Sequence, residues 1–225
     1  MKINYCLPII KETKEEVLEV ISVNKTTYQY FEVWLDYIRD VDEAFITALI
    51  SALGERLVLL FRRKNLEPIQ MDLEKKKEII LLLAKEKSLL DLDISSQQEE
   101  LDFIQKENVT LSKVVSYHNY QQTPSREELE SILEKIKKYS PTILKIATYC
   151  NSEADALILL QLLLQLKKEK KRFIILGMGE HGIITRLFGT LWGNEMLFAP
   201  KNIEEESAPG QMTKEKFDKI FEMLH

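Results

Sequence analysis

The sequence predicts an α/β protein whose eight parallel strands and eight helices close into a single-domain (β/α)8 TIM barrel. Short apolar runs alternate with longer amphipathic segments along the chain, as expected for strands joined by crossover helices. At 225 residues the chain is long enough for one barrel. No linker or low-complexity segment divides it, so we expect one domain over residues 1–225.

The elements follow from this alternation. Several expected helix starts place Ser, Thr or Asp before charged residues, as helix N-caps do. An open, doubly wound sheet is the competing arrangement, but eight regular units without a composition break favour closure. We expect strands at residues 2–7, 28–34, 57–61, 89–94, 113–117, 143–148, 172–176 and 196–198, and helices from about Lys14, Asp42, Asp72, Ser96, Ser125, Ser152, Gly182 and Thr213.

Composition limits the classes of partner. A net charge of −5 argues against a nucleic-acid surface, which is normally basic. The most apolar stretch, residues 156–166, is interrupted by Gln161 and Gln165 and is too short to span a bilayer. The only two cysteines, Cys6 and Cys150, suggest reduced thiols. We therefore expect a cytoplasmic protein without a membrane or nucleic-acid partner.

Lys145 is the most informative candidate for chemistry. It interrupts the apolar strand expected at residues 143–148, and alternate residues of a barrel strand point inward. A buried ammonium loses hydration, which lowers its pKa and frees a neutral amine to attack a carbonyl. The alternative is a lysine at a strand edge whose amine reaches water.

His118 ends the next strand before Lys145 in the sequence. Histidine titrates near neutrality and suits proton transfer at a carbon next to an imine. The alternative is a packed or loop histidine. The other two histidines, His181 and His225, lie far away in sequence, so no metal-ligand spacing is visible and we expect no metal.

Polar residues at other strand ends are candidates for substrate binding, because barrel active sites lie at the carboxyl ends of the strands. Glu32 lies near the end of the second expected strand, and Arg62 stands at the end of the third. Arg62 and Arg186 carry forks that match a carboxylate, and the Ser207–Gln211 segment contains a Pro-Gly turn beside a serine hydroxyl. Individually, each of these is also compatible with an ordinary surface position.

A glycine pattern needs a separate interpretation. Gly177, Gly179 and Gly182 match the Gly-x-Gly-x-x-Gly fingerprint of dinucleotide sites. The match follows the seventh strand, however, and a dinucleotide-binding half-domain needs more sheet beyond the motif. We therefore favour a phosphate-holding or simply tight loop over a dinucleotide site.

Together these segments resemble the type I 3-dehydroquinate dehydratase family over nearly the whole chain. The most specific are Ser116-Tyr-His118 followed by Thr123-Pro124, and Ser207-Ala-Pro-Gly-Gln211. Their order and spacing also agree with the family. The remaining matches are Tyr30-Phe-Glu-Val-Trp-Leu-Asp36, Leu59-Leu-Phe-Arg62, Leu144-Lys145-Ile-Ala and Gly182-Ile-Ile-Thr-Arg186-Leu.

The resemblance implies a hydro-lyase that converts 3-dehydroquinate to 3-dehydroshikimate, a step of the shikimate pathway of aromatic amino-acid biosynthesis. Lys145 would form an imine with the substrate ketone, and His118 would carry the proton in a syn elimination. Arg186 would hold the carboxylate, and Glu32 and Arg62 the ring hydroxyls. Ser207 and Gln211 would belong to a loop that closes over the site. It also implies a homodimer without a cofactor.

Two positions depart from the family pattern. The family usually has Arg where this chain has Trp34, and a histidine-orienting carboxylate where it has Leu66, with Glu67 next in sequence. A carboxylate partner fixes the tautomer of a histidine, so its loss weakens proton transfer unless Glu67 replaces it. We therefore expect an active enzyme with reduced or altered turnover.

Two alternatives remain. The first is a Schiff-base aldolase on the same barrel, which would use the 177–182 loop for a phosphate. The second is a weakened barrel that serves as a binding protein, which the Trp34 and Leu66 departures suggest. The presence of both Lys145 and His118 argues against the second.

Overall fold

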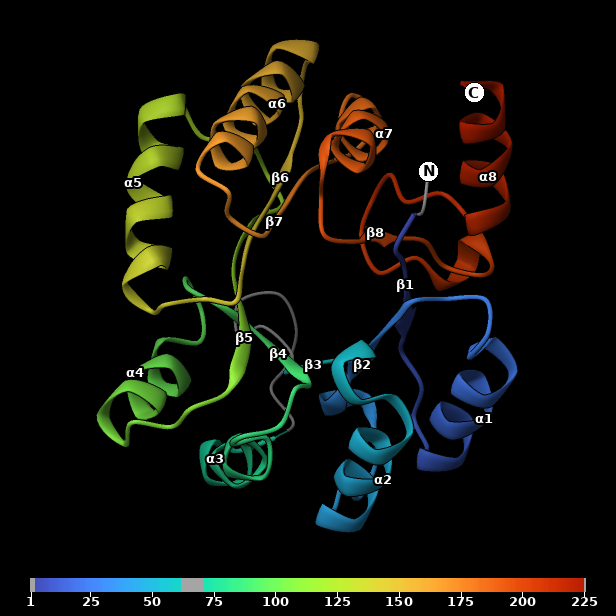
Figure 1. Ribbon diagram of the computed structural model, residues 1–225, viewed down its shortest axis with the longest axis vertical. Coiled ribbons are helices and arrows are strands. Elements are labelled where there is room, and N and C mark those ends of the chain that lie inside the picture. The colour runs from blue at the N-terminus through green and yellow to red at the C-terminus, as the bar shows by residue number, and fades with distance from the viewer. Residues whose placement is uncertain (1–2, 62–70, 225) are drawn as a thin grey trace.

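The computed structural model describes residues 3–61 and 71–224. Strands and helices alternate along the chain, and the strands form a central sheet (Figure 1). Every predicted strand and helix is present, with ends displaced by at most a few residues. The strands are β1 (Tyr5–Ile9), β2 (Tyr30–Trp34), β3 (Leu57–Leu60), β4 (Leu89–Asp93), β5 (Ser112–Asn119), β6 (Ile143–Tyr149), β7 (Phe173–Met178) and β8 (Leu197–Phe198). The helices are α1 (Lys14–Asn24), α2 (Glu43–Leu53), α3 (Leu73–Leu82), α4 (Gln98–Lys106), α5 (Arg126–Lys138), α6 (Glu153–Lys168), α7 (Ile183–Trp192) and α8 (Lys214–Met223).

All strand pairs in the sheet are parallel. Its order is β7-β6-β5-β4-β3-β2-β1-β8, so each strand from β1 to β7 pairs with its neighbour in sequence and β8 returns to β1. The helices surround the curled sheet (Figure 1). The structure confirms the predicted (β/α)8 barrel.

A side chain bridges the seam between β7 and β8. Asn194, just before β8, accepts a hydrogen bond from Ile175 N at 2.8 Å and donates one to Ile175 O at 2.9 Å. Glu195 N donates to Phe173 O at 2.9 Å. A Cβ atom at Gly189 would lie 2.4 Å from the Asn194 amide nitrogen, so the glycine makes room for this bridge.

Strand alternation divides the core into two layers. One set of strand residues packs against the surrounding helices in the larger apolar cluster. The opposite set fills the barrel interior, where a smaller cluster includes Val58, Leu89, Ile143, Ile174 and Phe198. Polar side chains at inward-facing positions therefore stand out, and they form the candidate site.

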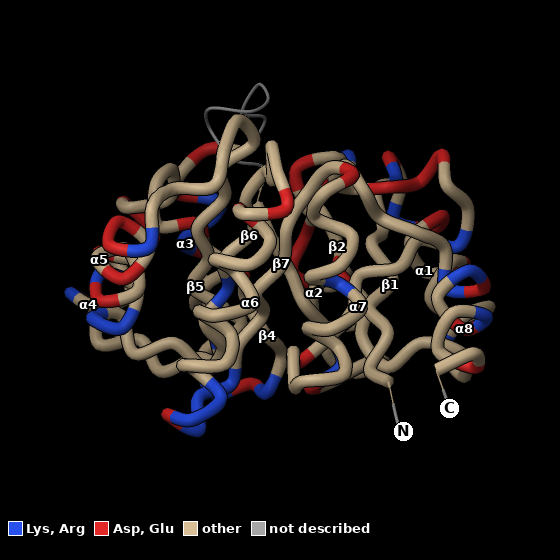
Figure 2. Tube along the Cα trace, turned by 90° about the horizontal axis from the view of Figure 1, so that it is seen from above, with Lys and Arg blue, Asp and Glu red and all other residues tan. Residues whose placement is uncertain are grey.

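The first and the last of the described residues lie at the same end of the molecule (Figure 2). β1 begins at that end, and the strands are parallel, so their carboxyl ends lie at the opposite end. Within residues 3–61 and 71–224, no helix is long and apolar enough to cross a membrane. The carboxyl ends of the strands are where barrel active sites form.

Candidate active site

Lys145 lies inside the barrel with only 4% of its surface exposed. It is paired in register with Ser116 on β5 and Ile174 on β7. Ile174 belongs to the interior apolar cluster. The lysine therefore occupies the inward-facing position that strand alternation predicts.

Two carboxylates face the lysine amine. Its Nζ lies 2.7 Å from Asp91 Oδ2 and 3.6 Å from Glu32 Oε1, and 4.6 Å from the centre of the Phe198 ring. The sequence alone predicted only that burial lowers the pKa of Lys145 and favours the neutral amine. The nearby carboxylates favour the ammonium and oppose that effect. Burial by itself therefore does not decide the protonation state of Lys145.

Both carboxylates are held in place by further hydrogen bonds. Ser116 Oγ donates to Asp91 Oδ1 at 2.5 Å, and Trp34 Nε1 donates to Glu32 Oε2 at 3.1 Å. Trp34 thus supplies a hydrogen-bond donor at the position where the family usually has an arginine. The neutral indole lacks the charge of a guanidinium but still orients Glu32.

His118 has a carboxylate partner from β4. Its Nδ1 lies 2.7 Å from Asp93 Oδ2, and the histidine ring stacks on Tyr120 with ring centres 6.2 Å apart. The Leu66 departure therefore does not leave His118 without a carboxylate partner. Arg62, Leu66 and Glu67 lie outside the described residues.

Arg186 on α7 is 1% exposed and only partly hydrogen-bonded. Its Nη2 donates to Pro209 O at 3.2 Å, whereas Nε and Nη1 have no hydrogen-bond partner within the described residues. Burial lowers the pKa of Arg186 to about 10, and the nearby Glu206 charge partly offsets this effect. The guanidinium is therefore still a cation at neutral pH, with two donors available for an anion.

Ser207 and Gln211 close a short loop through two hydrogen bonds. Ser207 N donates to Gln211 Oε1 and Gln211 Nε2 donates to Ser207 Oγ, both at 3.0 Å. Within this loop, Pro209 O also accepts a hydrogen bond from Gly179 N at 3.2 Å. The 207–211 loop is therefore tied to the glycine-rich segment and to Arg186.

Close packing explains the three glycines of the fingerprint. A Cβ atom at Gly182 would lie 2.4 Å from Gly177 C, and one at Gly177 would lie 2.5 Å from Cys150 Sγ. Gly179 has a φ of +78°, and a Cβ there would lie 2.8 Å from the Tyr149 ring. The pattern forms a tight turn against which the 207–211 loop packs.

One small cavity at the carboxyl ends of the strands joins the predicted residues. It has a volume of about 30 Å³, which is room for about one water molecule. Neither a sugar-sized substrate nor a nucleotide fits in this conformation. The predicted residues that line it are Glu32, His118, Lys145, Arg186, Ser207 and Gln211.

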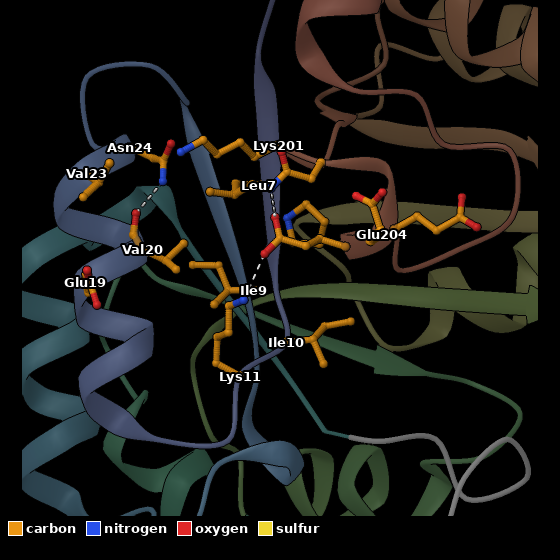
Figure 3. Close-up of a pocket in the computed structure, with 14 residues that line it drawn as sticks. Leu7, Ile9, Ile10, Lys11, Glu19, Val20, Val23, Asn24, Lys201 and Glu204 are labelled. Atoms are coloured by element: carbon orange, nitrogen blue, oxygen red, sulfur yellow. Dashed lines mark hydrogen bonds and ion pairs between the residues drawn. The ribbon is translucent and has the colours of Figure 1, made fainter.

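A larger hollow of about 560 Å³ lies elsewhere, between α1 and the segment after β8 (Figure 3). Leu7 and Ile9 of β1 form part of its wall, and they belong to the core on the helix side of the sheet. Lys11 and Glu205 form an ion pair at its edge at 2.9 Å. None of the predicted catalytic or substrate-binding residues that the structure describes lines this hollow, so size alone does not identify the site.

The sequence reasoning missed Asp91 and Asp93. A detectable signal was present, because two carboxylates of equal parity interrupt an apolar strand, as Lys145 does in β6. Both are buried, at 1% and 2% exposure. Equal parity places them on the same face of β4, towards Lys145 and His118.

The two cysteines offer no exposed thiol. Cys6 and Cys150 are unpaired and buried. Burial raises the pKa of the Cys6 thiol well above its usual range, so it stays protonated. Among residues 3–61 and 71–224, no group of three or more His, Cys, Asp or Glu side chains is placed to hold a metal ion.

Comparisons with a family model and with known proteins all match this chain to 3-dehydroquinate dehydratases. The type I 3-dehydroquinase family model matches residues 5–225. A 3-dehydroquinate dehydratase from Coxiella burnetii is 28% identical over 207 residues, covering 92% of this chain and 87% of that protein. One from Methanococcus maripaludis is 29% identical over 232 residues, covering 98% and 99%.

Solved structures share the fold. The crystal structure of 3-dehydroquinate dehydratase from Geobacillus kaustophilus HTA426 superposes with a TM-score of 0.82 at 24% identity. That comparison covers 100% of this chain and 91% of the other.

Proposed function

The chain belongs to the type I 3-dehydroquinase family and is a hydro-lyase that dehydrates 3-dehydroquinate, and we propose that it does so through an imine on Lys145. The observation that carries this proposal is the buried Lys145 amine, held 2.7 Å from Asp91 in the cavity that also contains His118 and Arg186. Each subsequent step assigns a role to one of these groups.

Imine formation requires the neutral amine of Lys145. Asp91, at 2.7 Å, is the nearest carboxylate that can take the proton, and Glu32 at 3.6 Å is the next. The amine then attacks the substrate ketone, and water leaves as the imine forms. A positively charged imine nitrogen withdraws electrons from the neighbouring carbon, whose proton becomes removable at neutral pH.

His118 then carries the proton. With Nδ1 held by Asp93, Nε2 is the basic ring nitrogen. It removes the C2 proton to give an enamine, and the same proton then goes to the C1 hydroxyl as it leaves. Water hydrolyses the remaining imine, which releases 3-dehydroshikimate and regenerates Lys145.

Arg186 supplies a site for the substrate carboxylate. Its Nε and Nη1 have no partner within the described part of the chain, and Nη2 carries a second N–H besides the one that it donates to Pro209 O. A carboxylate can therefore accept two hydrogen bonds from one edge of the guanidinium, formed by Nη2 and either Nε or Nη1. Glu32 and Arg62 would bind ring hydroxyls. The cavity of about 30 Å³ is too small for the substrate, so we expect the 207–211 loop to open and then close during turnover.

A direct assay tests this function. The wild type should convert 3-dehydroquinate to 3-dehydroshikimate, as followed by chromatography, whereas Lys145→Met and His118→Gln should lose activity while retaining the wild-type circular-dichroism spectrum. Turnover of a phosphorylated sugar in place of 3-dehydroquinate would favour the aldolase. A folded wild type without either activity would favour the binding protein.

We also propose a cytoplasmic homodimer that forms through the outer face of α6 and α7. Leu157 and Phe188 are 58% and 37% exposed on these helices. Arg186 is the only charged residue in residues 156–166 and 183–193, and it is buried. Sedimentation velocity should give a dimer for the wild type and for Val23→Glu on α1, and a monomer for the double variant Leu157→Glu, Phe188→Glu. A monomeric wild type would contradict the proposal.

A further inference from the structure

Asp93 is placed between a fixed turn and the histidine. Its Oδ1 accepts a hydrogen bond from Ser95 N at 2.9 Å, and its Oδ2 lies 2.7 Å from His118 Nδ1. Its own backbone N donates to Gln97 Oε1 at 2.8 Å. The carboxylate is thus anchored on one side by the β4–α4 turn before it meets the imidazole on the other.

Strand register determines which residue the carboxylate reaches. Asp93 is opposite Ser116 on β5, and His118 lies two residues further along that strand on the same face. Both side chains are shielded from water, with 3% and 7% of the carboxylate and imidazole exposed. The effect of the carboxylate on a positive charge that forms on the imidazole is therefore only weakly screened.

We infer that Asp93 is the positioning residue of His118, holding Nδ1 so that Nε2 is the basic nitrogen, in place of the carboxylate that the family has at the Leu66 position. This inference rests on the proposed function, since it assigns a partner to the proton carrier. Asp93 does not act on the substrate itself. It orients the ring and stabilises the imidazolium that forms when the proton is taken up.

Asp93→Asn is the sharpest variant, because an amide oxygen still accepts the hydrogen bond from Ser95 N while the negative charge is lost. We expect kcat to fall by about 10²–10³-fold, which lies within the contribution that proton transfer by a positioned side chain makes. The acidic limb of the kcat profile should move to lower pH, because the imidazole without its carboxylate is protonated less readily. Borohydride trapping of the substrate on Lys145 should persist.

Gln97→Ala is the matched control. It removes the side chain that accepts from Asp93 N and disturbs the turn, but leaves the carboxylate at His118. A merely structural role for Asp93 predicts that both variants lose kcat without moving the acidic limb. The positioning role predicts that only Asp93→Asn moves it, and that Asp93→Glu restores part of kcat.

A measurement on the wild-type protein tests the role of Asp93 without relying on variants that could fail to fold. Nitrogen NMR of the histidine side chains, assigned with His118→Gln, should show the His118 proton on Nδ1 at neutral pH. A proton on Nε2, or an Asp93→Asn variant that matches the wild type in kcat and pH profile, would overturn the inference. If the wild type itself does not dehydrate 3-dehydroquinate, the proposed function fails instead.

Discussion

The ionisable side chains of the site lie in two regions that differ in whether each side chain has a partner of opposite charge or a hydrogen-bond acceptor. In the strand region, Lys145 faces Asp91 and Glu32, and His118 faces Asp93. In the helix region, Arg186 is equally buried, but Nε and Nη1 lack partners within the described residues. The groups to which we assign the chemistry therefore have carboxylate partners before substrate arrives, whereas Arg186, to which we assign the substrate carboxylate, has none among the described residues. The difference suggests that binding energy is reserved for a carboxylate at Arg186.

Replacing Arg186 should have the largest effect and separates the two regions most clearly. Arg186→Met removes both unpartnered donors, so we expect kcat/KM to fall by about 10³-fold, mostly through KM. The same change should raise the free energy of unfolding by about 1–2 kcal/mol, because an undercompensated buried cation is removed. Steady-state kinetics measures the expected fall in kcat/KM, and urea unfolding measures the expected rise in the free energy of unfolding. A variant that is less stable than the wild type would contradict the comparison.

The pKa of Arg186 gives this prediction a pH dependence. Burial lowers that pKa to about 10, so the guanidinium is charged below this pH and loses its charge above it. We therefore expect the KM of the wild type to rise as the pH passes about 10. A KM that stays constant through pH 11 in the folded enzyme would show that another group holds the carboxylate.

Asp91→Asn should have a smaller kinetic effect and tests the compensated region. Removing one partner of a buried ion pair destabilises by about 3 kcal/mol, which denaturant unfolding measures. With one carboxylate fewer, Lys145 should lose its proton more easily, so imine trapping should extend to lower pH. Asp93→Asn is the control, because it should leave the pH dependence of trapping unchanged. An unchanged acidic limit in Asp91→Asn would mean that Glu32 alone sets the charge of the lysine.

Trp34→Arg should have the smallest effect. Trp34 already donates to Glu32 at 3.1 Å, and an arginine adds a charged fork for the ring hydroxyls. We expect kcat/KM to rise by about threefold, since one charge-assisted hydrogen bond at a partly exposed position is worth a fraction of its buried value. Trp34→Phe, which lacks the indole N–H, should be slower than the wild type. If Trp34→Arg is no faster, this interpretation of Trp34 is wrong.

The sequence was most informative where local patterns decide the structure. Apolar alternation predicted all eight strands, and the lysine in β6 was found because a charge interrupts an apolar run. The same rule applied to β4 would have found Asp91 and Asp93. Neither the Asn194 bridge across the seam nor the pairing of Asp93 with His118 was predictable, because each joins residues through strand register and barrel closure.

The most direct test of the central claim is intact-protein mass after incubation with 3-dehydroquinate and borohydride, for the wild type and Lys145→Ala. Reduction converts the imine into a stable secondary amine that keeps the substrate carbon skeleton on the protein. The account predicts added mass on the wild type and none on the lysine variant, with peptide mapping placing the adduct at Lys145. If a folded and active wild type gains no mass, or if Lys145→Ala gains the same mass, the lysine imine is contradicted.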